Sequence, residues 1–185
     1  MLIDITLCVT QEMMGTAWEN TAKSLVGHLG THFDVMDREF PLEYTQRKAV
    51  AFDVSAVRDR DIAVADISLN LVEAEMFVAF YTGFIGEEAY GTPAYFKEHP
   101  QLSVELIDAL LEKKVSIIGI DCAAIRKGKE HVPTDQRCAD QGVFVIENLC
   151  HLDSVLAVNK HFVARTFPMR IAGITGLPCR VVAEV

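Results

Sequence analysis

The sequence predicts an α/β protein built on a mixed central sheet. Two short, continuous apolar runs, residues 115–120 and 143–146, are typical of strands that are buried on both faces. A segment with helical features precedes each run, and helices that lead into buried strands are typical of α/β folds. The chain has 185 residues, enough for one domain with a sizeable core, so we expect residues 1–185 to form a single domain.

Six segments have the alternating or continuous apolar pattern of a β-strand. The N-terminal segment, MLIDITLCVT, has no basic flank and carries Asp4 early, so it is better interpreted as a first strand than as a signal peptide. In chain order, the expected strands cover residues 2–7, 48–54, 76–82, 115–120, 143–146 and 180–185.

Two segments predict helices. The segment SVELIDALLEKK begins with Ser103, a favourable N-cap residue, and places four apolar side chains on one helical face. These four are Leu106, Ile107, Leu110 and Leu111. The segment TDQRCADQG predicts a shorter helix, capped by Thr134 and ended by Gly142. The loops at residues 37–47 and 83–99 carry Gly, Pro and aromatic residues, and we expect such loops to wall a pocket.

The composition excludes several classes of protein. With 26 acidic and 17 basic residues, the net charge of −9 argues against nucleic-acid binding, which depends on Lys and Arg. No stretch approaches the roughly 20 apolar residues of a membrane-spanning helix. The five cysteines form no C-x-x-C pair, so we expect reduced thiols in a cytoplasmic protein. Since half of the residues are hydrophobic, a buried interface in a homo-oligomer is expected.

The segment GHLGTHFD, residues 27–34, places two histidines and an aspartate close together. In an extended strand, His28, His32 and Asp34 share one face, and Gly30 leaves a gap between the imidazoles. In a helix, Asp34 would point away from the histidines. Imidazole and carboxylate ligands together suit Zn, Mn or Fe. The alternative is a half-buried strand whose solvent face is rich in histidine.

Two imidazoles and one carboxylate do not complete a metal site, so other segments must contribute. Glu147 directly follows the apolar run 143–146, where a carboxylate is costly to bury unless it is paired or metal-bound. The alternative is that the strand ends there and Glu147 is solvated. The preceding helix offers Asp135, with His131 one turn earlier, and Asp140 as a third polar candidate.

These motifs resemble the cyclase family of metal-dependent hydrolases, which includes bacterial kynurenine formamidases (arylformamidases) and isatin hydrolases. The family signature H-x-G-T-H-x-D-x-P-x-H matches HLGTHFDVMDR as far as Asp34. The segments YGTPAYFKEHPQLS, VSIIGIDCAAI, GVFVIENLCHLDSV and FPMRIAGITGLPCRVVAEV follow in family order, so the resemblance covers nearly the whole chain. It implies a swivelling β/β/α fold, a small-molecule substrate, and a homodimer or homotetramer.

The resemblance also implies the ligands of one or two divalent ions, Zn or Mn. His28, His32, Asp34 and Glu147 match family ligands. A further family ligand is a histidine, and this chain has Asp135 at that position. An aspartate makes the site richer in oxygen, which favours Mn or Mg beside Zn. His131 is the alternative ligand, and Asp135 is preferred because it keeps the family register.

Where the family signature ends in an acid/base histidine, this chain has Arg38. A guanidinium does not release a proton near neutral pH, but it can bind a carboxylate or a developing oxyanion. Arg38 is therefore a candidate catalytic residue, and a surface salt bridge is the alternative. Trp18 and Tyr81 are the candidates for substrate contact, although Trp18 fits a core or interface position equally well.

The predicted activity is hydrolysis of an amide (formamide or lactam) or an ester by metal-activated water, with Asp34 or Glu147 carrying a proton. An amine leaving group needs protonation and the usual histidine is missing, which favours this broad class over a kynurenine formamidase. One alternative is a non-catalytic, metal-containing protein that binds small molecules. Another is a thiol nucleophile at Cys122 or Cys138, which lacks an evident histidine partner. His99 is interpreted as a turn residue.

Overall fold

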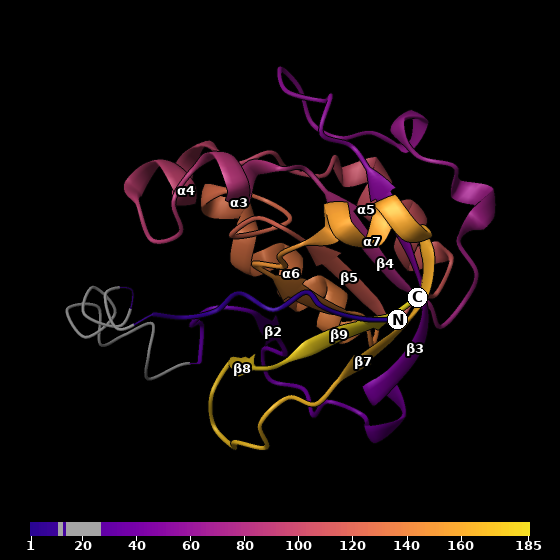
Figure 1. The fold of residues 1–185 in the computed structure, drawn as a ribbon. Coiled ribbons are helices and arrows are strands. Elements are labelled where there is room, and N and C mark those ends of the chain that lie inside the picture. The colour runs from indigo at the N-terminus through magenta and orange to yellow at the C-terminus, as the bar shows by residue number, and fades with distance from the viewer. Residues whose placement is uncertain (11–12, 14–26) are drawn as a thin grey trace.

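The computed structural model describes residues 1–10, 13 and 27–185, and its centre is a mixed β-sheet (Figure 1). The nine strands of this sheet lie in the order β1-β9-β7-β3-β4-β5-β6-β2-β8. Strands β3, β4, β5 and β6 are parallel neighbours, and every other neighbouring pair is antiparallel. The predicted fold class, an α/β protein with a mixed central sheet, is confirmed.

Each of the six predicted strand segments overlaps an observed strand. The bounds are β1 Leu2–Asp4, β2 His32–Asp34, β3 Gln46–Asp53, β4 Phe77–Tyr81, β5 Ile117–Ile120, β6 Phe144–Glu147, β7 His161–Thr166, β8 Gly176–Pro178 and β9 Val181–Glu184. Strands β7 and β8 were not expected. The first has polar residues at its two ends, and the second contains Gly and Pro, which are typical of turns.

The helices agree with the prediction at one segment and differ at another. Helix α5, Val104–Glu112, begins where predicted, with the Ser103 hydroxyl accepting the Leu106 N–H at 3.1 Å. Helix α6, His131–Asp140, begins one turn before Thr134, so the prediction that Thr134 caps this helix is wrong. Pro133 lies in the first turn of this helix, where proline is tolerated. The other helices among the described residues are α3 Phe84–Glu87, α4 Pro93–Glu98 and α7 Leu152–Val158, with 3-10 turns η1 Leu42–Thr45, η2 Val64–Asp66, η3 Leu69–Leu71 and η4 Gly128–Glu130.

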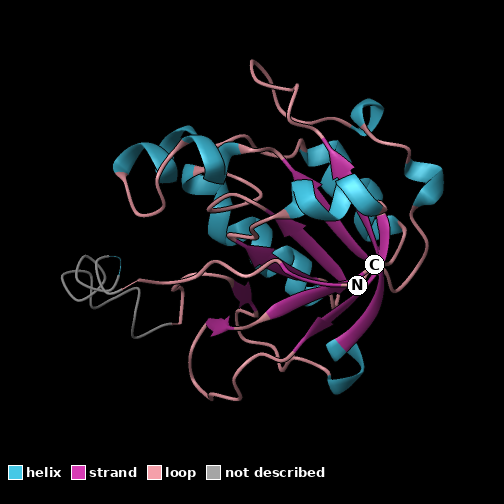
Figure 2. Cartoon of the chain, viewed as in Figure 1, coloured by secondary structure: helices cyan, strands magenta, loops and turns pink. Residues whose placement is uncertain are grey.

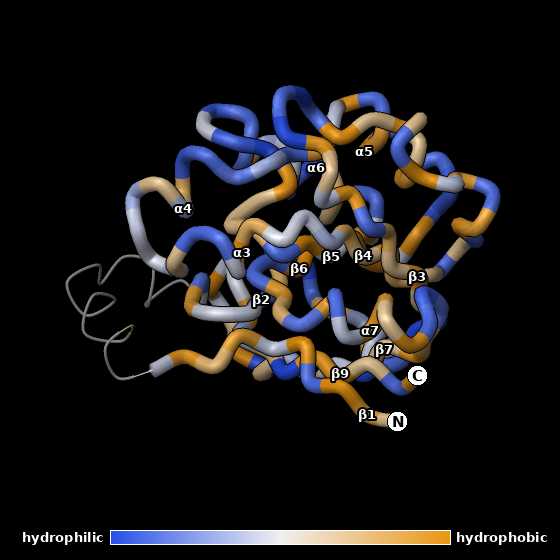
Figure 3. Tube along the Cα trace, turned by 45° about the horizontal axis from the view of Figure 1, so that its top comes forward, coloured by the Kyte–Doolittle hydropathy of each residue, from blue (hydrophilic) through white to orange (hydrophobic). Residues whose placement is uncertain are grey.

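Apolar side chains cover both faces of the central strands, as the continuous apolar runs predicted. Alternate residues of a strand point to opposite faces. Val78 and Ile118 face one core, which α5 covers, whereas Phe77 and Ile117 face the other, which α7 covers. Helices therefore lie on both sides of the sheet (Figure 2). In Figure 3 hydrophobic residues run through the strands, and hydrophilic residues gather on the outer loops.

The two ends of the chain lie side by side (Figure 1), because β1 pairs with β9 and the Val185 N–H donates to the Met1 carbonyl at 2.9 Å. None of the helices that the described residues form has the length and apolar character needed to cross a bilayer.

Candidate metal centre

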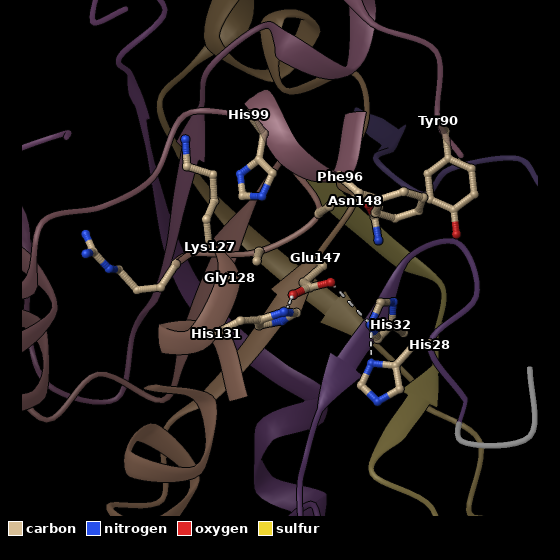
Figure 4. Close-up of a pocket in the computed structure, with 13 residues that line it drawn as sticks. His28, His32, Tyr90, Phe96, His99, Lys127, Gly128, His131, Glu147 and Asn148 are labelled. Atoms are coloured by element: carbon tan, nitrogen blue, oxygen red, sulfur yellow. Dashed lines mark hydrogen bonds and ion pairs between the residues drawn. The ribbon is translucent and has the colours of Figure 1, made fainter. Parts of the chain in front are cut away.

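The register between β2 and β6 joins two segments that are far apart in the sequence. His32 on β2 lies directly opposite Glu147 on β6, and Asp34 lies opposite Val145. Directly opposite residues of an antiparallel pair project to the same face, and so do residues two apart on one strand. His32, Asp34 and Glu147 therefore share a face, where His32 Nε2 lies 3.4 Å from Glu147 Oε2 (Figure 4).

The expectation of one continuous strand from His28 to Asp34 is wrong. The strand β2 covers only His32–Asp34, and the residues before it form a turn. Gly30 adopts a φ of +63°, and a Cβ atom there would lie 2.6 Å from Val9 Cγ2. Only glycine fits this backbone without strain. His28 thus reaches the cluster through a turn rather than through strand alternation.

Three predicted ligands meet at one point. His28 Nδ1 lies 3.0 Å from His32 Nε2 and 2.9 Å from Asp34 Oδ1, and His32 Nε2 lies 3.7 Å from Asp34 Oδ1. Bonds of about 2.1 Å to one ion place neighbouring ligand atoms about 3 to 3.5 Å apart. The three side chains are therefore spaced as ligands of a single divalent ion would be.

Hydrogen bonds at the outer ring nitrogens orient both imidazoles. His32 Nδ1 lies 2.9 Å from the Gly30 carbonyl, which accepts its hydrogen, so His32 Nε2 carries the lone pair. His28 Nε2 lies 2.8 Å from the Thr175 hydroxyl. Such outer partners typically fix the tautomer of metal-binding histidines. The nitrogen atoms that face the cluster are thus the ones free to bind an ion.

A second group of potential ligands shares Asp34 with the first. Asp34, His131, Asp135 and Glu147 each offer an atom, and these atoms all lie within 4.8 Å of one another. His131 Nε2 lies 3.1 Å from Asp135 Oδ2, one turn along α6, and 3.0 Å from Glu147 Oε1. The structure therefore brings Asp135 and His131 to the same group, although the sequence treated them as alternatives.

Two buried carboxylates of this cluster, Asp34 and Asp135, have histidines as their ion-pair partners. Both oxygens of Asp34 and the Oδ1 atom of Asp135 are buried without a hydrogen bond from the described residues. Burial raises the pKa of Asp135 well above its usual value, and the charges of Asp34 and Glu147 raise it further. Burial also raises the pKa of Asp34, but His28 and His32 outweigh it, and the net shift is downward. A divalent cation would satisfy these orphaned oxygens, so the donor set fits a metal.

A cavity of about 300 Å³ opens beside the cluster (Figure 4). His28, His32, His131 and Glu147 contribute to its wall. Its other lining residues include Tyr90, Phe96, His99, Ala123, Ala124, Lys127 and Asn148. This volume suits a small ligand, and the apolar residues give the ligand a surface to pack against. These four candidate ligands thus face a space that a small molecule can enter.

Two residues predicted for catalysis and substrate contact lie away from this cavity. The Arg38 side chain is half exposed and forms an ion pair with Asp140, as the surface salt-bridge alternative expected. Neither Arg38 nor Tyr81 lines the cavity. Tyr81 ends β4 and packs partly buried against the core that α7 covers. Trp18, the other candidate for substrate contact, lies outside the described residues.

The thiol interpretation finds no support in the geometry. Cys122 and Cys138 are fully buried, and neither lines the cavity. Burial raises the pKa of Cys122 well above its usual value and that of Cys138 to about 12. Both groups remain thiols at neutral pH, and a thiol is a poor nucleophile.

Sequence reasoning missed several residues of the site. His99 is not a plain turn residue: it is only 1% exposed, lines the cavity and holds its Nδ1 atom 2.8 Å from the Pro100 carbonyl. Asn148 donates to the Gly30 carbonyl at 2.9 Å and was detectable as the polar residue after Glu147. Tyr90 and Thr175 carry no sequence signal, because only the folded loops bring them to Gly30 and His28.

Residues 3–126 match the cyclase family model, described as "Putative cyclase", which covers more than half of the chain. The chain therefore belongs to the cyclase family. No curated protein sequence matches it significantly.

Solved structures share the fold. A protein described as a potential metal-dependent hydrolase with cyclase activity superposes with a TM-score of 0.77 at 23% identity, over 99% of this chain and 96% of the other. Isatin hydrolase A from Labrenzia aggregata superposes with a TM-score of 0.74 at 19% identity, over 99% of this chain and 93% of the other. Isatin hydrolase A from Ralstonia solanacearum superposes with a TM-score of 0.70 at 21% identity, over 84% of this chain and 71% of the other. These similarities confirm the predicted cyclase-like fold.

Proposed function

We propose that this protein is a metal-dependent hydrolase that acts on the carbonyl group of a small amide, such as a formamide or lactam, or of an ester. The observation that carries the proposal is the arrangement of His28, His32, His131 and Glu147, which form part of the cavity wall while they converge on one another. Ligands that face a cavity leave one coordination position for water or substrate, as catalytic sites require.

The donor atoms support one or two divalent ions, Zn or Mn. The first group offers two imidazoles and a carboxylate, a mixture that suits Zn. The second group offers one imidazole and three carboxylates, and this higher oxygen content suits Mn. An ion bound there would act as a Lewis acid and would lower the pKa of bound water to about 7.

The residues of this chain have separate tasks in the proposed reaction. Phe96, Ala123 and Ala124 offer an apolar surface to the body of the substrate. Glu147 lies between His32 and His131, where its carboxylate can take a proton from the attacking water and pass it on. Arg38 has no place in this scheme, because it lies in a surface ion pair outside the cavity.

The isatin hydrolases of similar fold support an amide or lactam bond as the target, and the one from Labrenzia aggregata is bound to an ester, benzyl benzoate. We therefore propose formanilide, a simple lactam and phenyl acetate as the first test substrates. Arylformamidase-like specificity, with cleavage of a C–N bond, would appear as preferential turnover of formanilide.

The test combines metal content and turnover. We expect the protein purified without chelators to contain one or two equivalents of Zn or Mn by elemental mass spectrometry, and to hydrolyse at least one test substrate. His32→Ala should lose both metal and turnover. His161→Ala is the matched control, because His161 is exposed at the start of β7 and belongs to neither ligand group. A wild-type protein that stays free of metal after reconstitution would contradict the proposal.

A non-catalytic protein that binds a metal and a small molecule is the second candidate. The observation in its favour is that Arg38, at the acid/base position of the family signature, does not reach the cavity. Full metal content without hydrolysis of amides, lactams or esters would favour this function over the enzyme.

We also propose a homodimer or homotetramer. Three large apolar side chains in the segment between β7 and β8 support it, since Phe167, Met169 and Ile171 are all exposed. Light scattering coupled to size-exclusion chromatography measures the assembly, and a monomer at micromolar concentration would contradict this proposal.

A further inference from the structure

Tyr90 lies over the side of the cavity that His28 and His32 form, and its hydroxyl oxygen points toward them (Figure 4). This oxygen accepts a hydrogen bond from the Gly30 backbone N–H at 2.9 Å. A phenol hydroxyl both accepts and donates, so accepting from Gly30 leaves its own hydrogen available. Within the part of the chain that the structure describes, the Tyr90 hydroxyl donates to no protein acceptor.

The Tyr90 hydroxyl keeps its proton. Burial raises the pKa of Tyr90, the hydrogen bond from Gly30 lowers it, and the negative charge of Glu147 raises it again, with a net upward shift. The group therefore acts near neutral pH as a hydrogen-bond donor and not as a base.

Aromatic packing holds the Tyr90 ring in place. Its centroid lies 5.5 Å from that of Tyr95 and 6.2 Å from that of Phe96, both in edge-to-face contact. Together with the hydrogen bond from Gly30, these contacts fix the position of the hydroxyl oxygen. A donor that is held in place before the reaction needs no reorganisation when charge develops.

Other polar groups of the cavity are engaged or lie farther away. The Asn148 side chain donates to Gly30 and accepts from a neighbouring tyrosine hydroxyl. Arg126 is paired with two carboxylates. His99 holds its Nδ1 atom against a backbone carbonyl, and Lys127 lies beside His99 on the opposite side of the cavity from His28 (Figure 4).

We propose that the Tyr90 hydroxyl donates a hydrogen bond to the carbonyl oxygen of the bound substrate as that oxygen gains negative charge. This inference rests on the proposed hydrolase function and adds a catalytic residue to it. The sequence had offered Arg38 for oxyanion binding, but Arg38 lies in a surface ion pair. Tyr90 supplies the donor from inside the cavity instead.

The proposal predicts a specific kinetic defect in Tyr90→Phe. Loss of one oxyanion donor lowers kcat by roughly 10²- to 10³-fold. Because the hydrogen bond strengthens in the transition state, kcat should fall while KM stays close to the wild-type value. The defect should appear with both formanilide and phenyl acetate, since both form an oxyanion at the attacked carbonyl.

Tyr44→Phe is the matched control. The Tyr44 hydroxyl also bonds one backbone group, the Gly142 carbonyl at 3.0 Å, but Tyr44 does not line the cavity. We expect this variant to keep the wild-type kcat, so that the loss of a hydroxyl and of one backbone hydrogen bond is controlled for.

Two measurements separate an oxyanion donor from a residue that only supports the Gly30 turn. The first is metal content, which should be unchanged in Tyr90→Phe. The second is binding of phenylphosphonate, a tetrahedral anion, to the metal-loaded protein by calorimetry. We expect Tyr90→Phe to bind phenylphosphonate at least about tenfold more weakly than Tyr44→Phe, which corresponds to about 1.4 kcal/mol.

The outcomes distinguish this inference from the function on which it rests. If the wild type is active and Tyr90→Phe keeps its kcat and its affinity for phenylphosphonate, the role of Tyr90 is wrong and the hydrolase stands. Loss of metal in Tyr90→Phe would make Tyr90 a support of the ligand turn and would also overturn the inference. A metal-loaded wild type that neither hydrolyses substrate nor binds phenylphosphonate would overturn the hydrolase, and this inference with it.

Discussion

His32 and Glu147 are direct partners across the antiparallel pair β2–β6, and their side chains meet with His32 Nε2 at 3.4 Å from Glu147 Oε2. Asp34 stands two residues along β2 on the same face and contributes an atom to both groups of potential ligands. One strand register therefore joins the GTHFD motif to the end of the buried strand β6 and places Asp34 between the two groups.

The shared position of Asp34 predicts that Asp34→Asn loses nearly all bound metal. Both ligand groups lose their common carboxylate, and an amide is a much weaker ligand for Zn or Mn. Elemental mass spectrometry measures the metal content. Asp140→Asn is the control, since Asp140 is exposed, pairs with Arg38 and belongs to neither group. Unchanged metal content in Asp34→Asn would show that neither ion depends on this carboxylate.

His131→Ala and Asp135→Asn should each remove only the second ion. Both residues belong to the second group, whereas His28, His32 and Asp34 remain to bind the first ion. If the wild type binds two equivalents, we expect each variant to retain about half of the metal. Complete loss in either variant would indicate one ion held by residues of both groups.

Arg38→Ala should leave metal content, thermal stability and turnover unchanged. The Arg38 guanidinium forms an exposed ion pair with Asp140, and such surface pairs contribute little to stability. It also lies outside the residues that line the cavity. Kinetics on the most active test substrate measure the effect. A large fall in kcat at normal metal content would restore the catalytic role that the sequence suggested.

The sequence predicts the parts of the fold that depend on local patterns. The apolar run before Glu147 and the capped segment after Ser103 form a buried strand and a helix as expected. The predicted ligands His28, His32, Asp34 and Glu147 also lie together, because the β2–β6 register brings the GTHFD segment beside the end of β6. The sequence did not predict Tyr90 and Thr175 as site residues, since their contacts with Gly30 and His28 depend on how distant loops fold over β2.

For Arg38, the sequence predicted a place in the site that the side chain does not occupy. Its place in the family signature suggests a position in the site, but the chain turns away after Asp34 and leaves its side chain half exposed on the surface. Position in a motif indicates where the backbone runs and does not fix where a long side chain ends.

Gly30→Ala should weaken metal binding and destabilise the protein. A φ of +63° costs an L-residue about 1 to 2 kcal/mol, and the new Cβ would also meet Val9 Cγ2 at 2.6 Å. Gly173→Ala measures the cost of the positive φ alone, because Gly173 has a φ of +78° and no heavy atom lies within 4 Å of the position of an added Cβ. Urea unfolding should show a larger loss of stability in Gly30→Ala, and only this variant should bind metal more weakly. Equal losses would mean that Val9 moves aside freely.

Because His99 is buried, we expect the metal-free protein to lose stability in mild acid. Burial lowers the pKa of His99 from 6.5 to about 4. The unfolded chain therefore takes up a proton between these values while the folded protein does not, and the free energy of unfolding falls as the pH drops from 7 toward 4. Integrating this difference in proton uptake gives a contribution of about 2 kcal/mol between pH 7 and pH 5.

A pair of variants isolates the contribution of His99 to this pH dependence. His99→Gln removes the titrating group, and His161→Gln removes an exposed histidine as the control. The variant His99→Gln is expected to be less stable at pH 7, because the hydrogen bond between His99 and the Pro100 carbonyl is lost. The decisive quantity is the change in unfolding free energy between pH 7 and pH 5, measured with urea after chelation of metals. It should be about 2 kcal/mol smaller in His99→Gln than in the wild type and His161→Gln. Equal changes in all three proteins would mean that His99 titrates normally and that the cavity wall around it admits water.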